Sequence, residues 1–168
     1  MLSVLAVTLS AGTYQPAQSG AFDAKELAEY RLTTATFERF VAASEQVAIV
    51  SRQDRTLSEH PLFTRDVSVL GEATVVAGQL QARLSGHAAL ANALSVTGIT
   101  AREYTKFALT LFGARLAHGF LSTGALRSVP KGVATDNVEF VKEHLEAVIR
   151  VLQVLGVEEP TGTSSPRK

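Results

Sequence analysis

The longest apolar stretch of the chain covers residues 99–124, and its pattern predicts a buried helix. Thr100 and Glu103 have the spacing of a capping box, in which the threonine hydroxyl accepts from the glutamate backbone N–H. Gly124 suits the left-handed conformation that ends many helices. Apolar residues cover most of the helix circumference, which is typical of a helix surrounded by protein or lipid. Three Arg or Lys residues and a histidine in this stretch argue against a membrane span, so we expect a core helix over residues 100–123.

Three further long helices are predicted, over residues 34–52, 66–85 and 136–155. Thr34 is the expected N-cap of the first, and apolar residues recur in it at steps of three and four. The last has an apolar seam of nearly three heptads, which favours packing in a bundle and has an intermolecular coiled coil as its alternative. The seam positions are Val138, Val141, Leu145, Val148, Leu152 and Leu155.

Shorter helices complete the pattern, one over residues 24–30 with Asp23 as its cap and one that ends at Gly98. No period-two alternation predicts a strand, and no internal repeat is present. We therefore expect an all-α, single-domain bundle over residues 22–157, with four main helices and the buried helix at its centre.

Residues 1–21 begin with an almost wholly apolar run and continue into small and polar residues. This order is typical of a secretory signal, although no Lys or Arg precedes the run. The alternative is a tail that docks on the domain, on a partner or on the surface of a membrane. Residues 2–11 are too few to span a bilayer, because a ten-residue helix is only ~15 Å long. The residues expected to dock are Leu2, Val4, Leu5, Val7, Leu9 and Tyr14.

The composition excludes several classes of function. Sixteen basic and 16 acidic residues balance to a net charge of zero, so nucleic-acid binding by clustered cations is not expected. The chain has no Cys, which removes disulfides, thiolate catalysis and cysteine metal sites. Residues 158–168 are rich in Pro, Ser, Thr and Gly, and we expect a flexible C-terminal tail.

No arrangement of residues indicates a catalytic centre, so we predict that the protein is not an enzyme. The chain lacks a P-loop, a G-x-S-x-G elbow and an H-E-x-x-H motif. His118 and His144 lie on the two last long helices and would approach each other if these helices pack antiparallel. Neither has a Glu three residues before it, as a di-iron bundle requires, and we expect neither a metal nor a cofactor.

One segment near the start of the central helix has the composition of an anion site. Arg102, Tyr104 and Lys106 lie in the first turns, where backbone N–H groups and the helix dipole favour negative charge. Plain capping and solvation of these side chains is the simpler interpretation, and it is the one we favour.

Two segments together resemble an uncharacterised group of small α-helical proteins from bacterial envelopes. The first contains Tyr30, Arg31, Leu32 and Thr33. In the second, "G-[IL]-[ST]-x-R-E-Y" matches Gly98, Ile99, Thr100, Arg102, Glu103 and Tyr104. The resemblance covers about a fifth of the chain, and no activity is known for the group. It implies export and a helical fold.

These observations predict a non-catalytic accessory subunit in the periplasm or cell envelope. Its partners would be other protein subunits of a larger, membrane-associated bacterial assembly, such as a respiratory or photosynthetic complex. The alternative is a periplasmic module that binds a small molecule in an apolar pocket between the last two long helices. Phe107, Leu111 and Phe120 are the residues expected to line that pocket.

Overall fold

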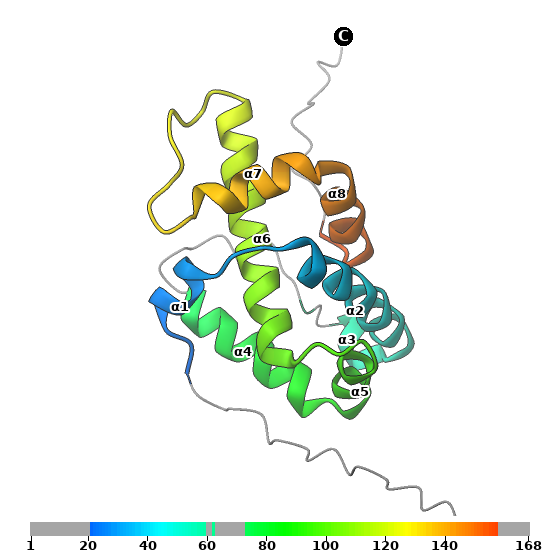
Figure 1. The fold of residues 1–168 in the computed structure, drawn as a ribbon. Helices are drawn as coiled ribbons and strands as arrows, with labels where there is room; N and C mark the ends of the chain where they lie inside the picture. Colours follow the sequence, from blue (N-terminus) through cyan, green and yellow to red (C-terminus); the bar gives the residue numbers. More distant parts are fainter. Residues whose placement is uncertain (1–20, 60–61, 63–72, 158–168) are drawn as a thin grey trace, which may run out of the picture.

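Helix α6, which spans Ala101–Ser122, runs through the middle of the structure, and the other helices pack around it (Figure 1). This computed structural model describes residues 21–59, 62 and 73–157. No strand occurs among those residues, which confirms the prediction of an all-α bundle. The other helices are α1 Ala24–Glu29, α2 Thr34–Gln53, α3 Arg55–Glu59, α4 Ala73–Gly86, α5 Ala88–Val96, α7 Thr135–Glu143 and α8 Leu145–Val154.

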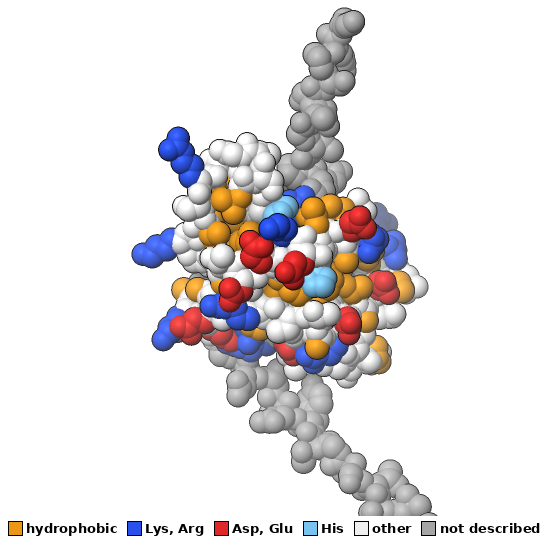
Figure 2. All heavy atoms as spheres, turned by 45° about the horizontal axis from the view of Figure 1, so that its top comes forward, with side chains coloured by type: hydrophobic (Ala, Val, Ile, Leu, Met, Phe, Trp, Pro, Cys, Tyr) orange, Lys and Arg blue, Asp and Glu red, His pale blue; other side chains and the backbone are white. Residues whose placement is uncertain are grey.

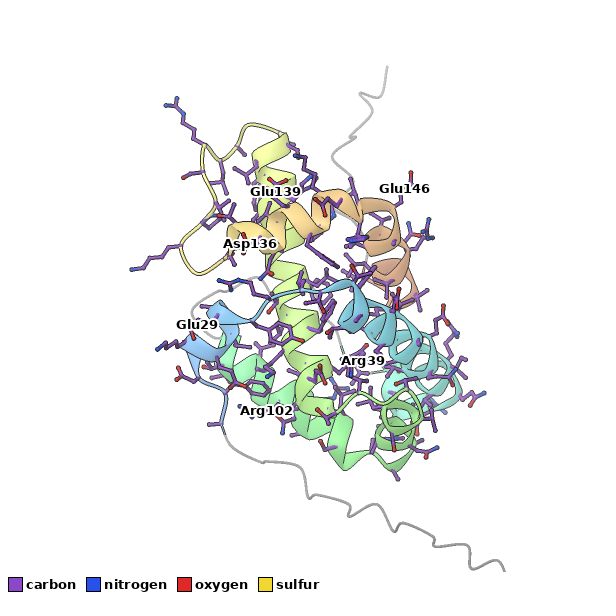
Figure 3. All side chains as sticks on the ribbon, in the orientation of Figure 1. Glu29, Arg39, Arg102, Asp136, Glu139 and Glu146 are labelled. Atoms are coloured by element: carbon purple, nitrogen blue, oxygen red, sulfur yellow. The ribbon has the colours of Figure 1, made fainter. Side chains whose placement is uncertain are left out.

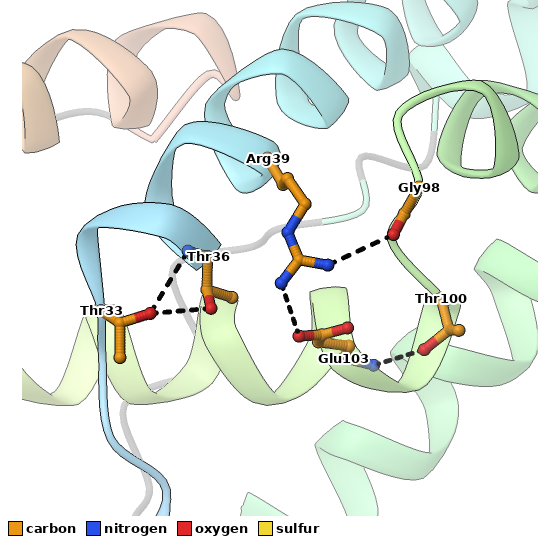
Figure 4. Close-up of polar contacts among 6 residues, drawn as sticks. All are labelled: Thr33, Thr36, Arg39, Gly98, Thr100 and Glu103. Atoms are coloured by element: carbon orange, nitrogen blue, oxygen red, sulfur yellow. Dashed lines mark hydrogen bonds and ion pairs between the residues drawn. The ribbon is translucent and has the colours of Figure 1, made fainter.

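Both ends of α6 form largely as predicted. The Thr100 hydroxyl accepts from the backbone N–H of Glu103 at 3.1 Å, and Gly124 has the left-handed φ of +73° after the helix. The Glu103 carboxylate, however, contacts Arg39 of α2, at 3.5 Å (Figure 4). Arg39 also donates to the carbonyl of Gly98 at 3.4 Å. The start of α6 is therefore held by an ion pair to a neighbouring helix.

The centre of α6 is buried, as the sequence predicts. Tyr104, Phe107 and Leu111 have no exposed surface. The Phe107 ring stacks on two aromatic rings of α2, with its centroid 6.1 Å from that of Phe37 and 4.7 Å from that of Phe40. Helices α4 and α7 pack on other sides of α6. The apolar circumference of this helix is thus covered along its middle by several neighbours.

The start of α2 differs by one residue from the prediction. Thr33 is the N-cap, and its hydroxyl accepts from the Thr36 backbone N–H at 3.3 Å, whereas Thr34 is the first helical residue (Figure 4). Of the helix expected over residues 66–85, the structure describes the part from Ala73, and it ends at Gly86.

The prediction of a single helix over residues 136–155 is wrong, because the chain turns at His144 between α7 and α8. A straight helix of 20 residues would be ~30 Å long, whereas α7 and α8 run in different directions (Figure 1). With the turn, α7 packs on α6 while α8 packs on α2. The His144 ring lies against Phe140 and Phe37, with centroids 4.4 and 5.9 Å apart.

The apolar seam of this region is nevertheless used within the chain. Val138, Val141, Val148 and Leu152 are buried, and Leu145 and Leu155 pack partly buried against the same core. These contacts favour packing in the bundle over an intermolecular coiled coil. The proposed domain limits remain predictions, since residues 1–20 and 158–168 lie outside the described part of the chain.

Candidate functional site

The residues expected in a docking tail, Leu2, Val4, Leu5, Val7, Leu9 and Tyr14, all lie outside the described residues. Their role stays a prediction. None of the helices in the described ranges is long and apolar enough to cross a membrane.

The three residues expected to line an apolar pocket do not share one surface. Phe107 and Leu111 are completely buried in the core. Phe120 lies thirteen residues after Phe107 on the same helix, and 50% of its surface is exposed. Because 3.6 residues make one turn, it also points to a different side of the helix. The structure therefore separates Phe120 from the other two side chains.

The histidines of the described ranges are not grouped in a metal site. His144 packs on aromatic rings, and Nδ1 of His118 is buried with no hydrogen-bond partner among the described residues. Within the described ranges, no three His, Cys, Asp or Glu side chains are grouped closely enough to hold a metal ion. Figure 3 shows the carboxylates of Glu29, Asp136 and Glu146 spread over the outside of three helices.

The cations expected at an anion site are already bound to a carboxylate of the same chain. Glu26 of α1 contacts Arg102 at 3.2 and 2.5 Å and Lys106 at 3.2 Å. The two cations also lie over aromatic rings, Arg102 on Phe22 at 4.4 Å and Lys106 on Tyr30 at 5.2 Å. These two cations thus contact a carboxylate of the same chain, an arrangement that neither interpretation of the sequence included.

A histidine and a carboxylate form a pair where α2 meets α3. Nε2 of His87, the N-cap of α5, lies 3.0 Å from Asp54, which also accepts from the backbone N–H groups of Thr56 and Leu57. These hydrogen bonds, with that from His87 the strongest, hold the pKa of Asp54 below its ordinary value. Nδ1 of His87 is buried and has no hydrogen-bond partner in the described part of the chain, where no nucleophile is therefore aligned on it. The pair therefore links the junction of α2 and α3 to the junction of α4 and α5.

Tyr104 is fully buried and Tyr30 is partly buried. Both have raised pKa values, because removal from water disfavours the charged phenolate. Burial and then the negative charge of Glu103 raise the pKa of Tyr30 to about 12. Burial also raises the pKa of Tyr104, whose hydroxyl lies 3.1 Å from that of Ser44. Both phenols therefore stay protonated at neutral pH, and a role as general base is disfavoured.

The last turns of α6 present the feature that the sequence did not predict. Leu116 and Phe120 are 42% and 50% exposed, and residues four apart in a helix lie on one face. Each other large exposed apolar residue of the described ranges stands alone on its helix: Ile49, Val75, Val96 and Val154. A pattern that is apolar on all sides does not reveal which side the fold leaves uncovered.

The loop after α6 folds back beside this exposed pair. The Leu126 N–H donates to the carbonyl of Phe120 at 3.1 Å, and a turn closes at Val133, whose N–H donates to Pro130 at 3.1 Å. We call residues 115–122 and the loop 123–134 together the α6 tip. In Figure 1 it extends beyond α7 at one end of the molecule.

Among the features described, the α6 tip is the candidate protein-binding surface, because it places two exposed large apolar side chains on one face of a helix. Comparison with protein-family models, curated proteins and solved structures gives no match.

Proposed function

We propose that this protein is a helical accessory subunit that docks onto another protein of a bacterial envelope assembly through the α6 tip. The observation that carries the proposal is the pair Leu116 and Phe120, half-exposed on one face at the end of the central helix. Complete burial of a Leu or Phe side chain is worth roughly 1.5–3 kcal/mol. A partner that covers both would gain a substantial share of this energy.

The shape of the tip also supports docking. Its helical half continues from the buried part of α6, so the exposed side chains are presented on a rigid element. Little conformational entropy is then lost when a partner binds. Aromatic side chains at the centre of an interface often dominate its affinity, and Phe120 is placed to have this role.

The location in the periplasm or envelope is part of the same proposal. Its support is the signal-like sequence of residues 1–21 and the resemblance of the two segments around Tyr30 and Tyr104 to envelope proteins. Mass spectrometry of the native N-terminus tests it: a chain that begins near residue 20 in the envelope fraction is expected. A full-length chain confined to the cytoplasmic fraction would contradict it.

The docking experiment replaces both apolar side chains, Leu116→Ser and Phe120→Ser, in cells that naturally express the protein. The wild-type chain should sediment from a gently prepared extract in an assembly larger than the 17.9 kDa of the single chain. The double variant should shift to the monomer. Val96→Ser is the matched control, since Val96 is 68% exposed but alone at the end of α5. Docking at the tip is refuted if the wild type is itself monomeric, or if the double variant stays in the assembly.

A further inference from the structure

Two cations lie on the loop that forms part of the α6 tip. Arg127 and Lys131 are exposed on the loop 123–134, and neither pairs with a carboxylate in the described part of the chain. Residues 104–135 contain no Asp or Glu at all. Figure 2, which turns the top of Figure 1 forward, shows Lys or Arg side chains standing out at one edge of the molecule, with hydrophobic side chains inward of them. The tip is therefore both apolar and locally positive.

The carboxylates nearest in sequence have cations of their own. Asp136, at the start of α7, lies 3.6 Å from Arg31, and Glu139 lies 3.2 Å from Lys142. Glu143 is at the far end of α7, about 12 Å along the helix from its first residue. Among the described residues, these carboxylates near in sequence thus form no ion pair with the loop cations, although the whole chain is neutral.

We propose that the surface docking on the α6 tip belongs to a different protein and carries carboxylates around an apolar socket. The socket covers Leu116 and Phe120, while the carboxylates face Arg127 and Lys131. This inference rests on the proposed function and adds the chemistry of the partner. Charges at the rim of an interface act mainly on the rate of association and on the choice of partner.

A second copy of the chain fits this surface poorly. Two tips packed together would place the Arg127 and Lys131 side chains of one copy near those of the other, and like charges at an interface are unfavourable. A membrane surface also fits poorly. Segments that bind anionic lipid usually present about four to eight cations, each worth about 1 kcal/mol, whereas the loop has two.

The first experiment places a photocrosslinkable phenylalanine analogue at position 120 in cells that naturally express the protein. Irradiation and mass spectrometry then identify what the side chain touches. We expect a peptide of another protein with apolar residues next to Asp or Glu. A crosslink to lipid, to a second copy of this chain or to a peptide without acidic residues would overturn the inference.

The second experiment reverses the charges, with R127E and K131E combined, and measures binding to the partner so identified. We expect about tenfold slower association at low salt, because electrostatic steering is lost. R52E combined with R150E makes the same change of net charge on α2 and α8 and should have little effect. Lysines in place of the crosslinked partner carboxylates should restore binding to the reversed tip.

The outcomes separate this inference from the proposed function. If the Leu116 and Phe120 variant loses the partner but the charge-reversed tip binds normally, docking stands and the acidic partner surface is refuted. If neither variant loses the partner, both are refuted. Vesicles of equal phosphatidylglycerol and phosphatidylcholine provide the lipid arm, and binding that requires Arg127 and Lys131 there would also refute the inference.

Discussion

At the scale of single residues, Asn137 has a structural role that its exposed neighbours on α7 do not share. It is 2% exposed, accepts from the backbone N–H of Leu32 at 2.9 Å and donates to the carbonyl of Tyr30 at 2.9 Å. Asn137→Ala should lower the free energy of unfolding by about 2–3 kcal/mol, since two backbone groups lose their partner. Urea denaturation measures this loss. Glu143→Gln, on the exposed side of α7, is the control, and an equal stability of both variants would contradict the role.

Tyr30 makes the stability sensitive to alkaline pH. Its folded pKa of about 12 lies above the ordinary 10.0. The stabilisation is fully present below pH 10, and it is lost as the pH rises towards 12, because the unfolded chain releases the proton first. Denaturation between pH 9 and 12 should therefore show a steeper loss of stability for the wild type than for Tyr30→Phe. Identical slopes would show that the phenol ionises as easily in the folded state.

At the scale of elements, α1 depends on charges because it has no buried residue of its own. Six residues are too few for a helix that is stable alone. Glu26→Gln should increase hydrogen exchange in residues 24–29 by about tenfold, since charged hydrogen bonds at partly exposed sites are worth about 1–1.5 kcal/mol. Glu29→Gln, which affects only the exposed pair with Lys25 at 3.8 Å, should have a smaller effect. Equal hydrogen exchange in the two variants would contradict the proposed contribution of Glu26 to the stability of α1.

The contacts of Glu26 with Arg102 and Lys106 also predict a response to acid. Burial acts to raise the pKa of Glu26, but the hydrogen bonds and charges of Arg102 and Lys106 outweigh it, so the pKa is lowered from 4.5. The stabilisation is therefore present above pH 4.5 and is lost as the pH falls through the lowered value. Amide hydrogen exchange in α1, corrected for the intrinsic exchange rate at each pH, should rise as the pH falls in the wild type. In Glu26→Gln it should stay nearly constant.

At the scale of the whole molecule, two phenylalanines of α6 provide a matched comparison. Phe107 is fully buried among aromatic rings, whereas Phe120 is half exposed at the tip. Phe107→Ala should cost about 3–5 kcal/mol through the cavity it leaves, and Phe120→Ala should change stability by less than about 0.5 kcal/mol. Thermal or urea unfolding distinguishes them. A large loss of stability for Phe120→Ala would show that the tip is part of the core.

Several parts of this fold could be predicted from local signals. The cap at Thr100, the stop at Gly124 and the apolar middle of α6 are set by residues close in sequence, because capping and burial patterns are local. The turn at His144 could not be predicted in this way. An uninterrupted apolar seam is compatible with one straight helix, and only the positions of α6 and α2 require the chain to bend there.

The candidate site likewise combines features that the sequence predicts with features that depend on tertiary contacts. The sequence by itself determined that α6 would be apolar on most sides and that the chain between residues 104 and 135 would lack acids. Only the tertiary structure decided that Glu26 binds the cations at the start of α6, and that neighbours cover Phe107 but leave Leu116 and Phe120 exposed. The physical reason is that burial depends on which helices reach a surface. Those contacts join residues far apart in the sequence, and no local pattern specifies them.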